Sequence, residues 1–188
     1  SKFFAENQAA HRWEKHRGLR ELSGKTACII GTGSVGSAIA RRLRAFDVQT
    51  VGINRFGHPA AEFDQTHPTC RLDDLLPLAD IAICAMPLTA ETAGLFDSVR
   101  IAKIKPGAVF VNVARGKVTD QQALVEALQS GQLFGAVLDV FEEEPLPRSS
   151  PLWDMEQVIL TPHNSFVGEH NGERLFRLIC KNLESFAQ

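Results

Sequence analysis

The 188-residue sequence lacks the features that mark several large classes of protein. It has no apolar run long enough to span a membrane, no secretory signal pattern and no low-complexity tract, so we expect a soluble, cytoplasmic protein that does not bind membranes. Its formal net charge of −2 gives no broad basic surface, which argues against nucleic acid as a partner. The four cysteines form no C-x-x-C pair, so we expect reduced, mostly core cysteines and no metal site.

The most informative stretch of the sequence is the segment 26–45. A short apolar run leads into Gly31-Thr32-Gly33-Ser34-Val35-Gly36, and apolar residues then recur at helical spacing. In such a strand-turn-helix unit, Gly31 allows the sharp turn, Gly33 lets a pyrophosphate approach the backbone, and Gly36 lets helix and strand pack closely. The unpaired N–H groups at the helix start would hold the phosphates. The stretch predicts dinucleotide binding, and the alternative is a tight turn that binds nothing.

The whole chain alternates short apolar runs with segments of helical periodicity. Strands are predicted at 27–30, 50–53, 69–72, 81–85, 109–113, 136–140 and 158–160. Helices are predicted at 1–18, from the glycine turn to residue 45, at 96–104, after a capping box Thr119-x-x-Gln122, and from residue 169 onward. This alternation predicts an α/β fold with a doubly wound, Rossmann-type parallel sheet in residues 23–188. Residues 1–22 would form an N-terminal helical arm.

The arm carries large apolar side chains at Phe3, Phe4 and Trp13. Such groups need cover, so the arm either docks on its own domain or packs on a second subunit. Both interpretations stay open at this point.

Several polar residues directly follow predicted strands. In a parallel sheet the carboxyl ends of the strands meet at one edge, where ligands bind. The residues are Gly31, Asn54, Pro87, Arg115, Asp139 and His163. Arg115 suits a substrate carboxylate because its planar fork can make two parallel hydrogen bonds. His163 suits proton transfer, since histidine ordinarily titrates near neutral pH, and a carboxylate such as Glu144 would favour the imidazolium.

Each of these residues also has a plain structural interpretation. Arg115 could lie in a surface turn, the run 142–144 could be a solvated acidic loop, and His163 could be structural. Asp139 either caps an element or hydrogen-bonds a nicotinamide carboxamide. The other histidines are predicted to lie on the surface, namely His11, His16, His58, His67 and His170.

Several long motifs resemble those of the D-isomer-specific 2-hydroxyacid dehydrogenases. They are the segments MPLTAET at 86–92, FVNVARG at 110–116, GAVLDVFEEEPLP at 135–147, PLW at 151–153 and VILTPH at 158–163. The resemblance covers nearly the whole chain. It implies an oxidoreductase that interconverts a 2-keto acid and a D-2-hydroxy acid with a nicotinamide cofactor.

The resemblance also implies a role for individual residues. Arg115 would hold the substrate carboxylate, His163 would be the general acid/base, and Glu144 would be its partner. Cofactor contacts are implied at Gly31, Gly33, Ser34, Val35, Gly36, Asn54, Arg55, Met86, Pro87, Thr92, Val113, Ala114, Asp139 and His163. Members of the family pair through the helix before the glycine turn, so residues 3–18 would form a homodimer contact.

The end of the second predicted strand departs from the NAD-binding pattern. NAD enzymes place Asp or Glu there to bind the adenosine ribose, whereas this sequence has Asn54 followed by Arg55. Arg55 could pair with a 2′-phosphate, weakly assisted by His58, so we expect NADP in preference to NAD. The alternative is that Asn54 suffices for the ribose and Arg55 points to solvent.

The sequence shows no separate substrate domain of the kind that family members usually carry. We therefore expect a cofactor-binding domain that binds the dinucleotide but turns over 2-keto acids poorly or not at all by itself. A different class is the alternative: a dinucleotide-sensing, dimeric binding module without turnover. The identity of the 2-hydroxy acid stays open.

Overall fold

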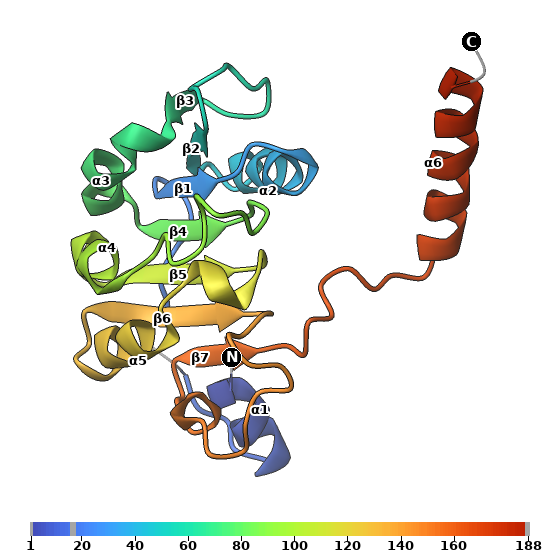
Figure 1. Ribbon diagram of the computed structural model, residues 1–188. Coiled ribbons are helices and arrows are strands. Elements are labelled where there is room, and N and C mark those ends of the chain that lie inside the picture. Colours follow the sequence, from blue (N-terminus) through green and yellow to red (C-terminus); the bar gives the residue numbers. More distant parts are fainter. Residues whose placement is uncertain (1, 16–17, 187–188) are drawn as a thin grey trace.

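The structure is a computed structural model that describes residues 2–15 and 18–186. Within these residues, seven strands form one sheet in the order β3-β2-β1-β4-β5-β6-β7, and every neighbouring pair is parallel (Figure 1). The order reverses at β1, as in doubly wound sheets. The predicted Rossmann-type α/β fold is therefore confirmed.

The strands are short, as expected for segments buried in a parallel sheet. They are β1 Thr26–Ile30, β2 Gln49–Asn54, β3 Gln65–Pro68, β4 Ile81–Cys84, β5 Ala108–Asn112, β6 Leu133–Leu138 and β7 Val158–Leu160. The α-helices are α1 Lys2–Ala9, α2 Ser34–Arg44, α3 Leu72–Leu75, α4 Ser98–Lys103, α5 Gln121–Gln129 and α6 Asn171–Phe186. Short 3-10 helices lie at Thr69–Arg71, Leu76–Leu78, Gly116–Val118 and Pro151–Trp153.

The core lies on both faces of the sheet, and β1 shows why. Cys28 and Ile30 point into a large cluster with residues of α3, α4 and α5, whereas Ala27 and Ile29 point into a smaller cluster beneath α2. Successive side chains of a strand alternate between faces, so a strand buried on both sides is apolar throughout. Burial raises the pKa of the Cys28 thiol to about 12, as fits an unreactive core cysteine.

The predicted third strand at 69–72 is wrong. The strand is Gln65–Pro68, residues Thr69–Arg71 form a 3-10 helix, and Leu72 begins α3 with its side chain fully buried. β3 pairs only with β2 at the edge of the sheet, and its residues are exposed or half-buried. An edge strand of this kind needs no apolar pattern, which is why the sequence did not reveal it.

Two helix starts or ends also differ from the prediction. The N-cap of α5 is Asp120, whose carboxylate accepts a hydrogen bond from the N–H of Ala123, so Thr119-x-x-Gln122 is not the capping box. The predicted helix 1–18 ends at Ala9, and residues 10–15 form a turn and an irregular segment. Residues 16–17, including His16, lie outside the described residues. Of the other histidines, His11, His58 and His170 are exposed, and His67 is half-buried.

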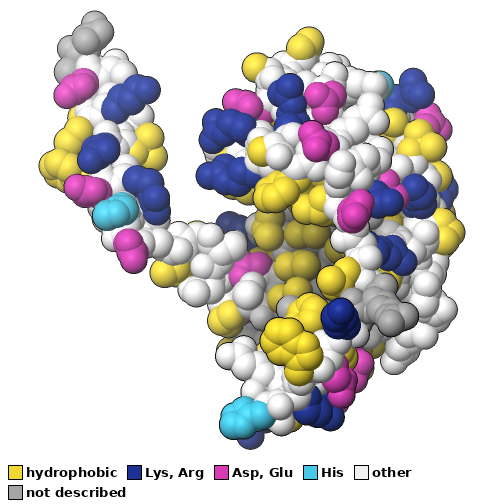
Figure 2. All heavy atoms as spheres, turned by 180° about the vertical axis from the view of Figure 1, so that it is seen from behind, with side chains coloured by type: hydrophobic (Ala, Val, Ile, Leu, Met, Phe, Trp, Pro, Cys, Tyr) yellow, Lys and Arg dark blue, Asp and Glu magenta, His cyan; other side chains and the backbone are white. Residues whose placement is uncertain are grey.

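Apolar surface is exposed at both ends of the described chain. Trp13 is 95% exposed, and Phe4 is also exposed. Helix α6 stands apart from the sheet (Figure 1), and the side chains of its predicted apolar face, Leu175, Ile179, Leu183 and Phe186, are exposed. Seen from behind, apolar side chains also gather in a hollow of the surface (Figure 2). None of the described helices is long and apolar enough to cross a membrane.

Candidate functional site

The glycine turn between β1 and α2 leaves room for an anion. Gly31 has a φ of +107°, which favours glycine, and a side chain on Gly36 would clash with the carbonyl oxygen of Gly31. By contrast, a Cβ on Gly33 would meet nothing within 4 Å. No side chain caps α2, and the N–H groups of Ser34 and Val35 find no acceptor among the residues that the structure describes. These open donors at a helix N-terminus fit the pyrophosphate of a dinucleotide.

Asn54 lies at the end of β2, and its side-chain amide is hydrogen-bonded to residues of the adjacent loop and of the glycine turn. Its amide nitrogen donates to the hydroxyl of Thr32 at 3.2 Å and to the carbonyl of His58 at 2.8 Å. Its amide oxygen accepts from the N–H groups of Phe56 at 3.3 Å and His58 at 3.0 Å. The next residue, Arg55, is exposed and makes no ion pair with any described residue.

The segment 86–92 after β4 forms a tight loop facing the glycine turn. The Thr92 hydroxyl donates to the carbonyl of Pro87 at 2.7 Å and accepts from the N–H of Thr89 at 2.8 Å, so it holds the loop closed. The carboxylate of Glu91 accepts from the Thr89 hydroxyl at 2.7 Å. That hydrogen bond, the N–H of Glu91 itself and the charge of Arg55 lower the pKa of Glu91. Arg55 and this loop therefore interact electrostatically across the strand ends.

A buried asparagine organises the loop that carries Arg115. Asn112, the last residue of β5, is 2% exposed; its amide oxygen accepts from the N–H of Ala114 at 3.0 Å, and its amide nitrogen donates to the carbonyl of Arg115 at 3.2 Å. Gly116 packs so closely on the backbone of Phe141 that any side chain there would clash. The sequence reasoning missed Asn112, although a polar residue closing a buried apolar strand was a usable signal.

Asp139 follows β6 and anchors the segment after β7. The residue is 2% exposed, and its carboxylate accepts from the Thr161 hydroxyl at 2.5 Å and from the N–H groups of Asn164 at 2.8 Å and Ser165 at 3.1 Å. Burial alone would raise the pKa of Asp139, but the hydrogen bonds from Ser165, Thr161 and Asn164 together outweigh it and lower the pKa. The carboxylate is thus charged, and it fixes the backbone on both sides of His163.

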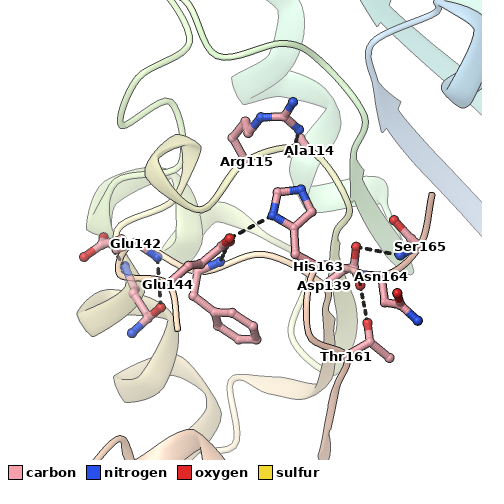
Figure 3. A network of polar contacts seen from close by, with 11 residues as sticks. Ala114, Arg115, Asp139, Glu142, Glu144, Thr161, His163, Asn164 and Ser165 are labelled. Atoms are coloured by element: carbon pink, nitrogen blue, oxygen red, sulfur yellow. Dashed lines mark hydrogen bonds and ion pairs between the residues drawn. The ribbon is translucent and has the colours of Figure 1, made fainter. Parts of the chain in front are cut away.

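His163 is held in place from its backbone and from its ring. Its N–H donates to the carbonyl of Asp139 at 2.8 Å, and its φ is +50°. The ring nitrogen Nδ1 lies 2.8 Å from the Glu144 carboxylate, which also accepts from the N–H of Phe141 at 2.9 Å (Figure 3). A carboxylate only accepts, so Nδ1 carries the proton, and Nε2 bonds no described residue. Figure 3 shows Arg115 near the His163 ring, with its guanidinium folded back to donate to the carbonyl of Ala114 at 2.6 Å.

The electrostatics of the pair rest on Glu144. Burial would raise the pKa of Glu144, but the hydrogen bonds from His163 and Phe141 together outweigh it, and the pKa is lowered. Of the neighbouring glutamates, Glu142 accepts from the N–H of Gln121 at the start of α5 and Glu143 is exposed. Of the three glutamates, Glu144 is the one whose carboxylate contacts the His163 ring and orients it.

Comparison with known proteins agrees with this geometry. Residues 2–165 match the family model described as D-isomer specific 2-hydroxyacid dehydrogenase, NAD binding domain. The chain belongs to this family. It is 40% identical over 166 residues to a glyoxylate reductase of Pyrococcus furiosus, covering 88% of this chain and 49% of that protein. It is 41% identical to glyoxylate/hydroxypyruvate reductase B of Citrobacter koseri, covering 85% of this chain and 51% of that protein.

Solved structures of the family superpose on nearly the whole chain. A D-isomer specific 2-hydroxyacid dehydrogenase family protein from Aeromonas salmonicida has a TM-score of 0.88 and 38% identity, covering 99% of this chain and 59% of that one. An NADPH-dependent glyoxylate/hydroxypyruvate reductase from Sinorhizobium meliloti, in complex with NADP and sulfate, has a TM-score of 0.85 and 30% identity, with the same coverage. The chain spans about half the length of the curated relatives it matches.

For this 2-hydroxyacid dehydrogenase domain, the sequence-predicted site residues fall into two sets. The expected catalytic residues Arg115, Glu144 and His163 come together from the three loops that follow β5, β6 and β7. Three of the expected polar cofactor contacts instead form side-chain hydrogen bonds within the loops that carry them; these residues are Asn54, Thr92 and Asp139. The remaining expected contacts line the same strand ends, and they are Gly31, Gly33, Ser34, Val35, Gly36, Arg55, Met86, Pro87, Val113 and Ala114. Their contact with a cofactor stays a prediction.

Proposed function

We propose that this domain serves an oxidoreductase that interconverts a small 2-keto acid and its D-2-hydroxy acid with NADP or NAD. The observation that carries the proposal is the pair of His163 and Glu144, 2.8 Å apart, beside Arg115 and at the strand ends that also form the open glycine turn. Ligands of such sheets bind at these strand ends. A cofactor site and a proton-transfer pair at one edge fit a hydride-transfer enzyme.

In the proposed reaction, the bound reduced nicotinamide supplies the hydride. Arg115 would hold the substrate carboxylate through two parallel hydrogen bonds and polarise the adjacent carbonyl. His163 would donate a proton from Nε2 to the carbonyl oxygen as it gains negative charge, and would take that proton back in the reverse direction. Glu144 would keep the ring oriented and stabilise the imidazolium before it donates.

We infer NADP as the preferred cofactor and a small keto acid as the substrate. Arg55 is exposed, and Asn54 stands at the end of β2 where NAD enzymes carry the carboxylate that would repel a 2′-phosphate. Among the structures that resemble this one, a family member from Xanthobacter autotrophicus was solved in complex with NADPH and MES. The relatives named glyoxylate reductase and glyoxylate/hydroxypyruvate reductase support a substrate such as glyoxylate or hydroxypyruvate.

We further propose a cytoplasmic homodimer that uses the segment 3–15 as part of its contact. Phe4 and Trp13 are exposed there, and large apolar groups of this kind are usually covered in the working assembly. By itself this chain would bind the dinucleotide but turn over keto acids poorly, because Arg115 is exposed and the His163 side chain is 38% exposed, so water reaches both.

Cofactor binding is tested with Gly33→Ala, because the structure has room for the added methyl group but a pyrophosphate would meet it. We expect the dissociation constants of NADPH and NADH to rise together by about tenfold or more, with an unchanged melting temperature. Gly172→Ala, on the open surface of α6, is the matched control and should change neither. Unaltered nucleotide affinity in Gly33→Ala would contradict binding at this turn.

Catalysis is tested with His163→Asn in the full-length protein, assayed against a panel of 2-keto acids. We expect the turnover number to fall by about 10² to 10⁴, since removing a general acid has effects of that size, while NADPH affinity is retained. Turnover equal to that of the wild type would remove the proton-transfer role. A full-length protein that binds NADPH and reduces none of the acids would favour a dinucleotide-sensing module.

A further inference from the structure

The amide of Asn54 has no hydrogen-bonding capacity left for a ligand. An asparagine side chain offers two N–H donors and a carbonyl oxygen that accepts twice. Both donors are used, on the Thr32 hydroxyl at 3.2 Å and the His58 carbonyl at 2.8 Å. Both acceptor sites are used as well, by the N–H groups of Phe56 at 3.3 Å and His58 at 3.0 Å. A ribose hydroxyl could reach this amide only by displacing one of these partners.

The four bonds join two loops of the cofactor site. Those to Phe56 and His58 fold residues 54–58 around the amide, and the one to Thr32 ties this loop to the second residue of the glycine turn. Thr32 is itself pressed against β2, since a Cβ on Gly52 would lie 2.7 Å from the Thr32 methyl. The loop after β2 is therefore tied to the turn that would hold the pyrophosphate, and on its other side it packs on Pro68 at the end of β3.

Arg55 has no comparable anchor of its own. Its side chain is exposed and its guanidinium carbon lies 5.4 Å from the centre of the Phe56 ring. No described carboxylate forms an ion pair with it, although its charge lowers the pKa of Glu91. The position of its Cα, and hence the reach of its guanidinium, depends on the loop that Asn54 closes.

We propose that Asn54 is a positioning residue for cofactor selection: it holds Arg55 where a 2′-phosphate would bind, and it does not itself bind the ribose. This inference rests on the proposed NADP preference. It reverses the role expected from position alone, in which the residue at the end of β2 contacts the ribose hydroxyls.

The proposal predicts an unusual result for Asn54→Asp, the change that would install the acidic residue of NAD enzymes. The carboxylate could still accept from Phe56 and His58, and the Thr32 hydroxyl could turn to donate to it. The His58 carbonyl has no hydrogen to donate, so the 2.8 Å bond is replaced by repulsion between two oxygens. The loop would open, and the new carboxylate would not be presented to the ribose.

The test compares NADPH and NADH binding by nucleotide fluorescence for this chain and its Asn54→Ala, Asn54→Asp, Arg55→Gln and Asn54→Ala/Arg55→Gln variants. We expect Asn54→Ala to weaken NADPH about tenfold and NADH less than about twofold, because only the phosphate contact is lost. Asn54→Asp should not tighten NADH. In the Arg55→Gln background, Asn54→Ala should cause no further change in the ratio of the two affinities. Asn182→Ala, on exposed α6, is the matched control and should leave both affinities unchanged.

The possible outcomes distinguish a failure of the positioning role of Asn54 from a failure of the proposed NADP preference. Tighter NADH binding by Asn54→Asp, or equal losses for both nucleotides in Asn54→Ala, would show that Asn54 contacts the ribose and would overturn the proposal. If Arg55→Gln changes the ratio of NADPH affinity to NADH affinity and Asn54→Ala does not, only the positioning role of Asn54 is overturned. An unchanged ratio in Arg55→Gln would overturn the proposed NADP preference and the positioning role with it. If Asn54→Ala does not fold, Asn54→Ser can replace it, because serine keeps a hydroxyl that can donate and accept. This variant should also lower the ratio of NADPH affinity to NADH affinity.

Discussion

The two ends of the strand edge are held by opposite kinds of anchor. At the His163 end, Asp139 is a charged carboxylate, 2% exposed, that gathers a hydroxyl and two backbone N–H groups from residues more than 20 positions away. At the Arg55 end, Asn54 is a neutral, half-buried amide whose partners lie in its own loop and in the glycine turn. Both side chains are held by several hydrogen bonds, but only Asp139 carries a charge that is buried from water.

The difference suits what each end is proposed to do. A buried charge is costly unless its hydrogen bonds are complete, so the segment after β7 is held to one conformation, including the positive φ of His163. A proton donor benefits from such rigidity, because its efficiency depends on a fixed geometry. A half-buried amide competes with water for its partners, so Asn54 is expected to position the loop proposed to select the cofactor at a smaller gain in stability.

The largest effect is expected when the charged anchor is removed. Asp139→Ala leaves the N–H groups of Asn164 and Ser165 and the Thr161 hydroxyl without their shared acceptor, a residue that is itself 2% exposed. We expect the free energy of unfolding, measured by urea denaturation, to fall by about 2–4 kcal/mol. Asp154→Ala, at an exposed aspartate, is the control and should stay within about 0.5 kcal/mol of the wild type. A fall of less than about 1 kcal/mol in the free energy of unfolding of Asp139→Ala would mean that the segment around His163 keeps its conformation without the Asp139 carboxylate.

A second prediction separates the two anchors by pH. The pKa of Asp139 in the folded protein lies below its ordinary value of 3.8, so its charge adds stability that is complete above that value and is lost as the pH falls through the folded pKa. Urea denaturation of the wild type and Asp139→Asn should therefore give a difference that is constant near neutral pH and shrinks below about pH 4. Asn54 does not titrate, so the difference between the wild type and Asn54→Ala should not shrink in the same way. A difference for Asp139→Asn that grows in acid would contradict the assignment.

The sequence predicted which residues would meet but not how their polar groups would be used. Arg115, Glu144 and His163 could be brought together in advance because parallel strands end at one edge, and the apolar runs located those ends to within about two residues. Asn54, Thr92 and Asp139 were placed at the same edge, yet their hydrogen bonds depend on backbone conformations that no local pattern contains. Asp139 meets Ser165 across 26 positions of sequence. The polar edge strand β3 escaped prediction for the related reason that its pairing requires no apolar period.

The smallest effect on stability is expected at the neutral anchor. Asn54→Ala removes hydrogen bonds in a half-buried loop where water can reach the freed groups, so we expect the free energy of unfolding to fall by less than about 1 kcal/mol. The same variant is expected to change the ratio of NADPH to NADH affinity, whereas Asp139→Ala should lower stability far more. Urea denaturation of both variants under one set of conditions makes the comparison direct. A loss for Asn54→Ala as large as that for Asp139→Ala would show that the loop 54–58 is as rigid as the segment around His163. Rigidity at the Arg55 end would then come from completed hydrogen bonds alone, without a buried charge, and the two ends would differ in chemistry but not in function.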